Sequence, residues 1–217
     1  MPRFAVPTGA TGAKGAAPEV ITQLAFVDGK VIVAGLSNED FSSTLRLVPY
    51  PFSKADHGAS IEIYHTSHFA YETASPVRSM VPYTTGGEKY LLAVYTCTPL
   101  VKFPIADLKP NSGSKYRGQT IAELGAGNRP IDMIVYKKGG KDFLLMSNSA
   151  RGVMKVALDN IDSVDTISAR VADTAGLKYE TLKQHAGVEH LAQLGDAHAV
   201  MLVRGTAGVS IQTIELP

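Results

Sequence analysis

PIDMIVYKKGGKDFLLMSNSARGVMKVAL, residues 130–158, contains three apolar segments separated by two turns that contain glycine. The segments span residues 130–136, 143–146 and 153–158. Glycines between short apolar segments are a strong local signal for β-hairpins, because a tight turn needs residues that tolerate positive φ. This stretch therefore predicts three consecutive antiparallel strands.

The same three-strand pattern recurs along the chain, which indicates a repeat architecture. We predict four units, at residues 18–68, 76–125, 130–184 and 187–217. A fourth candidate strand follows in the first three units, at residues 60–65, 120–124 and 177–182. Four strands per unit and a spacing of roughly 40–50 residues are typical of propeller blades. The predicted fold is all-β, a β-propeller-like array of about four four-stranded antiparallel blades.

The second strand of each unit is almost continuously apolar: VIVAGL at 31–36, YLLAVY at 90–95, FLLMS at 143–147 and AVMLV at 199–203. A strand that is covered on both faces has this pattern, so each second strand is expected to lie between neighbouring sheets. Helix is scarce, and residues 159–172 are predicted to form an irregular excursion with at most a single helical turn.

The fourth unit has no candidate fourth strand at its C-terminal end. Residues 1–17 are either a linker rich in glycine and alanine or, through Phe4, Ala5 and Val6, the strand that closes the ring. Alternatively, the chain is half of a larger ring that is completed by a second copy or by further sequence. We therefore expect a homo-oligomer or a part of a larger chain or complex.

The repeat pattern resembles that of β-propellers in the broad group that includes the quinoprotein-dehydrogenase-like, lactonase-like and NHL/YWTD propellers. The resemblance covers residues 18–216 at the level of the blade pattern, and it implies a propeller fold. The Trp-Asp dipeptide, the Kelch glycine signature and the YWTD tetrapeptide are absent. Because propellers host unrelated functions, the resemblance transfers no functional residue.

Charge and cysteine content narrow the class of protein. The 21 basic and 20 acidic residues give a net charge of +1 without blocks of like charge, so neither a nucleic-acid interface nor an anionic membrane surface is indicated. No apolar segment approaches the ~20 residues of a membrane span. Cys97 is the single cysteine, so no disulfide forms within the chain. A soluble protein is expected, either cytoplasmic or, after removal of a signal peptide, periplasmic or secreted.

The candidate binding residues lie at one end of the predicted blades. In a propeller, the loop before the first strand and the loop between the second and third strands lie on the same face. This face would carry Arg129, Asp132, Asn148, Arg151, Cys97 and Arg204. Arginines that converge there suit a carboxylate or phosphate ligand, although the polar groups can equally cap turns and brace blades. A lone thiol such as Cys97 can be reactive but more often packs as a small hydrophobe.

Two groups of histidines are candidate metal ligands. His185 and His190 flank the entry to the fourth unit and His198 begins its second strand, but their spacing matches no established ligand pattern. His65 and His68 form an HxxH pair, whose side chains would point to opposite faces of a strand unless the loop bends. A metal would also need a third ligand, such as Asp56, His57 or Glu72. The sequence alone favours ordinary polar loop histidines in both groups.

Two functions remain open on this basis. The first is a binding module whose rim loops hold a protein partner or a small anionic ligand. The alternative is a propeller enzyme, a lactone or ester hydrolase or a cofactor-dependent oxidoreductase, that uses the residues at the channel rim. No GxSxG, P-loop, CxxC or HExxH motif is present, and no motif identifies a cofactor. We therefore expect a binding module.

Overall fold

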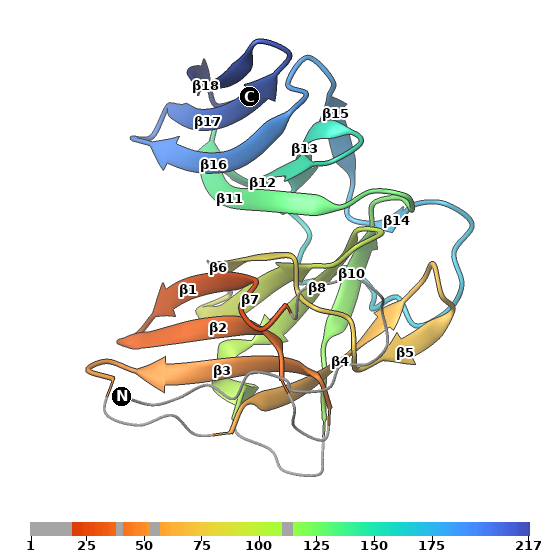
Figure 1. Cartoon of the computed structure of the whole chain (residues 1–217). Helices are drawn as coiled ribbons and strands as arrows, with labels where there is room; N and C mark the ends of the chain where they lie inside the picture. Colours follow the sequence, from red (N-terminus) through yellow and green to blue (C-terminus); the bar gives the residue numbers. More distant parts are fainter. Residues whose placement is uncertain (1–18, 38–40, 53–56, 110–114) are drawn as a thin grey trace.

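In the computed structural model, which describes residues 19–37, 41–52, 57–109 and 115–217, the chain folds into four largely antiparallel β-sheets (Figure 1). The predicted all-β class is therefore confirmed. The only helical element in these ranges is a single 3-10 turn, η1 (Ile105–Asp107). The described residues therefore contain no helix that is long and apolar enough to cross a membrane. Residues 1–17, with the predicted closing strand, lie outside the described part of the chain.

The first sheet is a meander that begins with a tight hairpin. Asp28 and Gly29 both have positive φ, 49° and 72°, as a two-residue hairpin turn requires. The strand order is β1 (Gln23–Val27), β2 (Lys30–Leu36), β3 (Ser43–Pro49), β4 (Ala59–His65) and β5 (Ala70–Glu72). A short strand from the second unit, β9 (Tyr116–Arg117), pairs with β4 in the parallel direction. This exchange ties the first sheet to the second.

The second sheet repeats the meander and ends on a short added strand. Its first three strands are β6 (Ser79–Thr85), β7 (Glu88–Val94) and β8 (Pro99–Pro104). Next to β8 lies β10 (Gln119–Glu123), and β14 (Ala175–Gly176) pairs with the outer side of β10. Because β14 comes from the excursion after the third meander, it links the second sheet to the third.

The third and fourth sheets contain only strands of the C-terminal half, and between β13 and β15 the chain leaves the third sheet to form β14. The third sheet comprises β11 (Pro130–Lys138), β12 (Lys141–Asn148), β13 (Gly152–Ala157) and β15 (Tyr179–Leu182). The fourth comprises β16 (Val188–Leu194), β17 (His198–Gly205) and β18 (Gly208–Glu215). Residues 159–172 form turns and bends, as predicted.

Four strands per sheet, the number predicted, occur only in the third sheet. The fourth sheet has three described strands, the second has five and the first has six. The additional strands β5, β9 and β14 have two or three residues each, and no periodic pattern identifies so short a strand. Each of these short strands pairs with the edge of a longer strand, so its position depends on tertiary structure and not on local sequence.

The first strands of the four sheets follow one another in space: β6 contacts β1 and β11, and β11 in turn contacts β16. One apolar core joins the first three sheets, and a second core lies between the third and fourth. Along β12 the side chains alternate between the cores, since Leu144 and Met146 face the first while Leu145 faces the second. The third sheet is thus covered on both faces.

Candidate functional site

A cleft of about 560 Å³ opens where the N-terminal ends of the four first strands meet. Its charged and polar lining comes from all four units: Glu19 and Thr22 from the first, Arg78 from the second, Arg129 and Ser149 from the third, and Glu189 and His190 from the fourth. Ligand sites are typically concave and combine apolar walls with a few convergent polar groups. Here the apolar wall includes Ile21 and Ile131.

Two β-bulges shape the cleft. The pairing of β11 with β12 skips Ile131, and the pairing of β16 with β17 skips Glu189. A bulge inserts one unpaired residue into a strand and redirects the side chains around it, and such bulges are common beside binding sites. Both skipped residues line the cleft. The third and fourth sheets therefore use the same device at the same position.

Glu19 and Arg78 neutralise each other on the side of the cleft formed by the first two units. The Arg78 guanidinium forms an ion pair with the Glu19 carboxylate through Nη1, and its Nε donates to Thr96 Oγ1 at 3.0 Å. The side chain of Arg78 is only 16% exposed, so it is held in place on the wall of the cleft. These two groups form a fixed, closed pair.

Glu189 and Arg204 form a second closed pair on the opposite side. Nε and Nη2 of Arg204 donate to the two carboxylate oxygens of Glu189, in the bidentate geometry that guanidinium and carboxylate groups favour. The hydrogen bonds from Arg204 hold the pKa of Glu189 below its usual value. Arg204 therefore acts on the cleft through Glu189, as a partner of its carboxylate.

Arg129 carries the uncompensated charge of the cleft. Its backbone is fixed on both sides by Ser149, whose amide donates to Arg129 O at 2.9 Å while its hydroxyl accepts from Arg129 N at 3.1 Å. Its guanidinium is exposed, and no group in the described part of the chain accepts a hydrogen bond from it. A positioned backbone with an unengaged guanidinium suits an anion that arrives from solution.

His190 stands beside Arg129 in the lining and is positioned by Asp132. The Asp132 carboxylate accepts from the amide of Leu191 at 2.9 Å and lies 3.5 Å from Nδ1 of His190. These contacts connect β11 to β16 near the cleft. Asp132, predicted as a ligand-binding residue, thus lies behind His190 and couples the third sheet to the fourth.

Three other predicted residues cluster away from the lining, at the junction of the second and third sheets. Arg151 donates to the carbonyls of Leu124 and Ala126 at 2.9 and 3.0 Å, and Asn148 accepts from the buried Asn128 at 2.9 Å. Cys97 sits in a left-handed turn, with φ of 64°, and its amide donates to Asn128 O. Their described contacts are those of groups that cap turns and brace adjacent sheets.

The three histidines predicted around the fourth unit are not brought together. His190 faces Leu202 near one end of the β16–β17 hairpin, whereas His198 pairs with Leu194 at the other end. His185 lies in the turn that follows β15, where its amide donates to Leu182 O. In the described ranges, the only group of three potential ligands within metal-binding distance is a different one, His65, His68 and Glu72.

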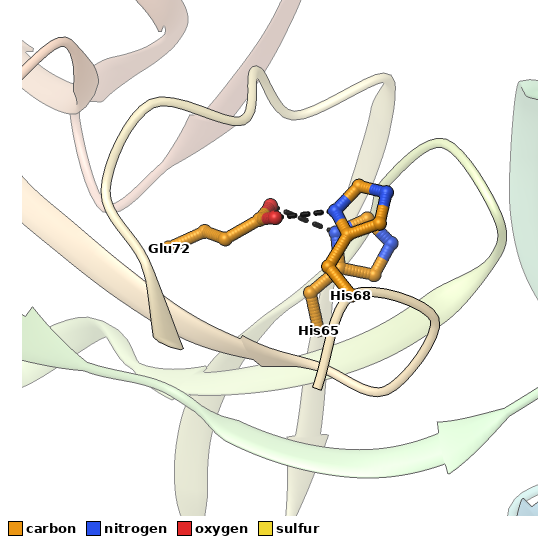
Figure 2. Close-up of side chains that lie close together, drawn as sticks. All are labelled: His65, His68 and Glu72. Atoms are coloured by element: carbon orange, nitrogen blue, oxygen red, sulfur yellow. Dashed lines mark hydrogen bonds and ion pairs between the residues drawn. The ribbon is translucent and has the colours of Figure 1, made fainter. Parts of the chain in front are cut away.

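His65, His68 and Glu72 converge on the β4–β5 hairpin (Figure 2). Nδ1 of His65 donates to one Glu72 oxygen at 2.8 Å, and Nδ1 of His68 donates to the other. The loop therefore bends, as convergence of the HxxH pair requires, while the interpretation of these residues as ordinary polar histidines stays a prediction. Of the other proposed third ligands, His57 is not in this group and Asp56 lies outside the described residues.

Sequence reasoning did not assign Glu19 and Arg78 to the rim, although a signal for them was available. Both precede the first strand of their unit, as Arg129 does in the third. Glu19, Arg78 and Arg129 thus lie at comparable places in their units, which groups them at one rim, whereas Glu189 lies inside β16 at its bulge and is not found by this comparison. No family model matches the chain, and its sequence matches no curated protein significantly.

Proposed function

We propose that the chain is a binding module whose cleft takes the carboxylate or phosphate group of a small ligand. The observation that carries this proposal is the unengaged guanidinium of Arg129, placed in a cleft whose two carboxylates, Glu19 and Glu189, already have arginine partners. An anion that enters the cleft meets positive charge without displacing an existing ion pair. The neighbouring imidazole of His190 offers a second donor.

The same observations favour a rigid site. Arg78 and Arg204 are each held by at least one carboxylate, and the backbone of Arg129 is bound twice by Ser149. With the walls of the cleft held in this way, binding of an anion would cost mainly the conformational entropy of the Arg129 side chain. Because the donors come from several sheets, the arrangement of the sheets determines whether the site exists.

We further propose that the four sheets are blades of a propeller-like array, with the cleft at one end of its axis. The support is the spatial order of β1, β6, β11 and β16 together with the cleft that their N-terminal ends share. In this arrangement the predicted units at residues 18–68, 76–125, 130–184 and 187–217 are the blades. The cleft would then correspond to the mouth of a channel.

The array is proposed to be half of a ring that a second copy completes. Leu24 and Phe26 on the outward face of β1 are 56% and 65% exposed, and Val209 and Ile211 on β18 are 50% and 75% exposed. The first and last sheets thus each present apolar side chains that a neighbouring sheet would cover. The solution mass, measured by light scattering, tests this step: a dimer is expected, and a monomer at all concentrations would contradict it.

Anion binding is tested by titrating the protein with inorganic phosphate and with citrate while the Nε–H signal of Arg129 is followed by NMR. A charge-assisted hydrogen-bonding group is worth about 1.5–3 kcal/mol, so Arg129→Gln should weaken binding about 10- to 100-fold. Arg170→Gln is the matched control, because it removes an exposed guanidinium that stacks on Phe69 instead. Equal affinity of wild type and Arg129→Gln for both anions would refute the proposal.

A further inference from the structure

The β4–β5 hairpin brings three metal-ligating side chains to one face. In its register Ile63 lies opposite Glu72 and His65 lies opposite Ala70, so His65 and Glu72 are diagonal neighbours on the same face. The turn bends back between them, with His68 N donating to His65 O and Phe69 in a left-handed conformation at φ 56°. Because of this bend, the side chain of His68 lies on the same face as His65 and Glu72. On a regular strand, the HxxH spacing would place His68 on the opposite face from His65.

The donor set is that of a zinc site with three protein ligands. The ligand atoms all lie within 4.8 Å of one another, and the two imidazole rings are 4.1 Å apart between centroids. Zinc bound tetrahedrally at about 2.0–2.1 Å separates its ligand atoms by roughly 3.3 Å. The present His65–Glu72 contact is 2.8 Å, so the side chains need only a small outward movement to admit the ion.

Hydrogen bonding among these three residues leaves a polar group unsatisfied. His65 is 2% exposed, yet its Nε2 has no partner in the described part of the chain, and the same holds for Oγ1 of the adjacent Thr66. Burying a ring nitrogen without a hydrogen-bond partner costs folding free energy. Such groups in native structures call for an explanation, for example a functional role or an ion. The nitrogen that faces Glu72 is Nδ1, so Nε2 is not the atom offered to a metal at this contact.

The carboxylate of Glu72 already faces both imidazoles. Its oxygens accept hydrogen bonds from Ser75, His65 and His68. The site is closed on one side and open on the other, since the side chains of His65 and His68 are 3% and 55% exposed. Solvent or an anion can therefore reach a metal from the side of His68.

We propose that His65, His68 and Glu72 bind one Zn²⁺, with the fourth coordination position open to water or to an anionic group. This site is separate from the cleft at Arg129 and does not depend on the function proposed for it. Two imidazole nitrogens and one carboxylate oxygen are a common ligand set for Zn²⁺, whereas Mg²⁺ prefers oxygen ligands throughout.

The test is equilibrium dialysis of chelator-treated protein against Zn²⁺, with the bound metal measured by mass spectrometry, and Co²⁺ as a spectroscopic probe. Wild type should bind one Zn²⁺ per chain, and bound Co²⁺ should show the visible absorption of a site with imidazole ligands. His68→Asn and Glu72→Gln should each weaken Zn²⁺ binding at least tenfold. The control His198→Asn, an exposed histidine on β17, should leave the affinity unchanged.

His68 is the principal test position because it is exposed, so its replacement should preserve folding; the unfolding temperatures of the metal-free variants verify this. Two outcomes would overturn the proposal. One is Zn²⁺ binding by wild type that is no tighter than binding by His68→Asn and Glu72→Gln. The other is a one-equivalent site that is lost in His198→Asn, which would place the metal on the fourth sheet.

Discussion

The second strands of the second and fourth sheets are both continuously apolar in sequence but have very different surroundings. In β7, Leu91, Leu92, Ala93 and Val94 are all fully buried. In β17, the equivalent apolar segment is buried only at alternate positions, Ala199 and Met201, while Val200 and Leu202 between them remain partly exposed. One strand is covered on both faces, and the other on one.

The difference arises from neighbours, because both segments are continuously apolar. β7 belongs to a sheet that packs between the first and third sheets, whereas the fourth sheet shares a core only with the third. A continuous apolar pattern predicts that both faces of a strand are covered in the working molecule. The pattern in β17 therefore indicates that its partly exposed face is also covered in the working molecule, and the proposed second copy of the chain would cover it.

The largest effect expected from this comparison is at the centre of β7. Leu91→Ala removes a fully buried side chain from the core shared by three sheets, and the cavity it leaves should cost about 2–5 kcal/mol of unfolding free energy. Urea unfolding measures it. A loss below 1 kcal/mol would mean that the second sheet is not enclosed by its neighbours.

A pH-dependent effect is expected in the same sheet. The Glu123 carboxyl on β10 is 2% exposed and burial raises its pKa to about 7. The folded state therefore binds this proton more tightly than the unfolded state, and the contribution of Glu123 to stability falls as pH rises from about 4.5 through 7, by about 3 kcal/mol in total. Glu123→Gln should remove that decline.

The measurement for Glu123 is urea unfolding of wild type and Glu123→Gln at pH 5 and at pH 8. The stability of the wild type relative to the variant should be lower at pH 8 than at pH 5. Parallel pH profiles for the two proteins would show that the carboxyl titrates normally and is not enclosed.

A smaller loss of stability is expected at the contact between the third and fourth sheets. Asp132→Ala removes the acceptor of the Leu191 amide and the anionic neighbour of His190, which should cost about 2 kcal/mol. If the fourth sheet depends on this link, the loss should appear first as weaker amide protection in β16. Unchanged protection in β16 would mean that the apolar core alone holds the two sheets together.

The smallest effect on the single chain is expected at the outer face of the fourth sheet. Ile211 is 75% exposed on β18, so Ile211→Ala should change the unfolding free energy by no more than about 0.5 kcal/mol. If a second copy covers this face, Ile211→Lys should instead lower the solution mass from dimer to monomer. A dimer that persists in Ile211→Lys would exclude this face from the interface.

Much of the strand framework could be predicted because it depends on local pattern. The segment at residues 30–36 and the Asp28-Gly29 turn before it specify a hairpin without help from the rest of the chain, and β2 has these bounds. The convergence of His65 with His68 could not be predicted, since it depends on a left-handed Phe69 that the sequence does not announce. The sequence also could not decide whether Asn148 and Arg151 face a ligand or brace adjacent sheets, because both kinds of position carry the same polar residues.

The final strand has a consequence for motion within the fold. In the described part of the chain β18 pairs only with β17, and nearly all of its side chains are exposed. Its opening breaks one ladder of hydrogen bonds and uncovers little apolar surface, so it should open at a far lower free energy than β7, which is paired on both sides. We therefore expect β18 to open more readily than β7, and a partner that covers β18 should slow its opening.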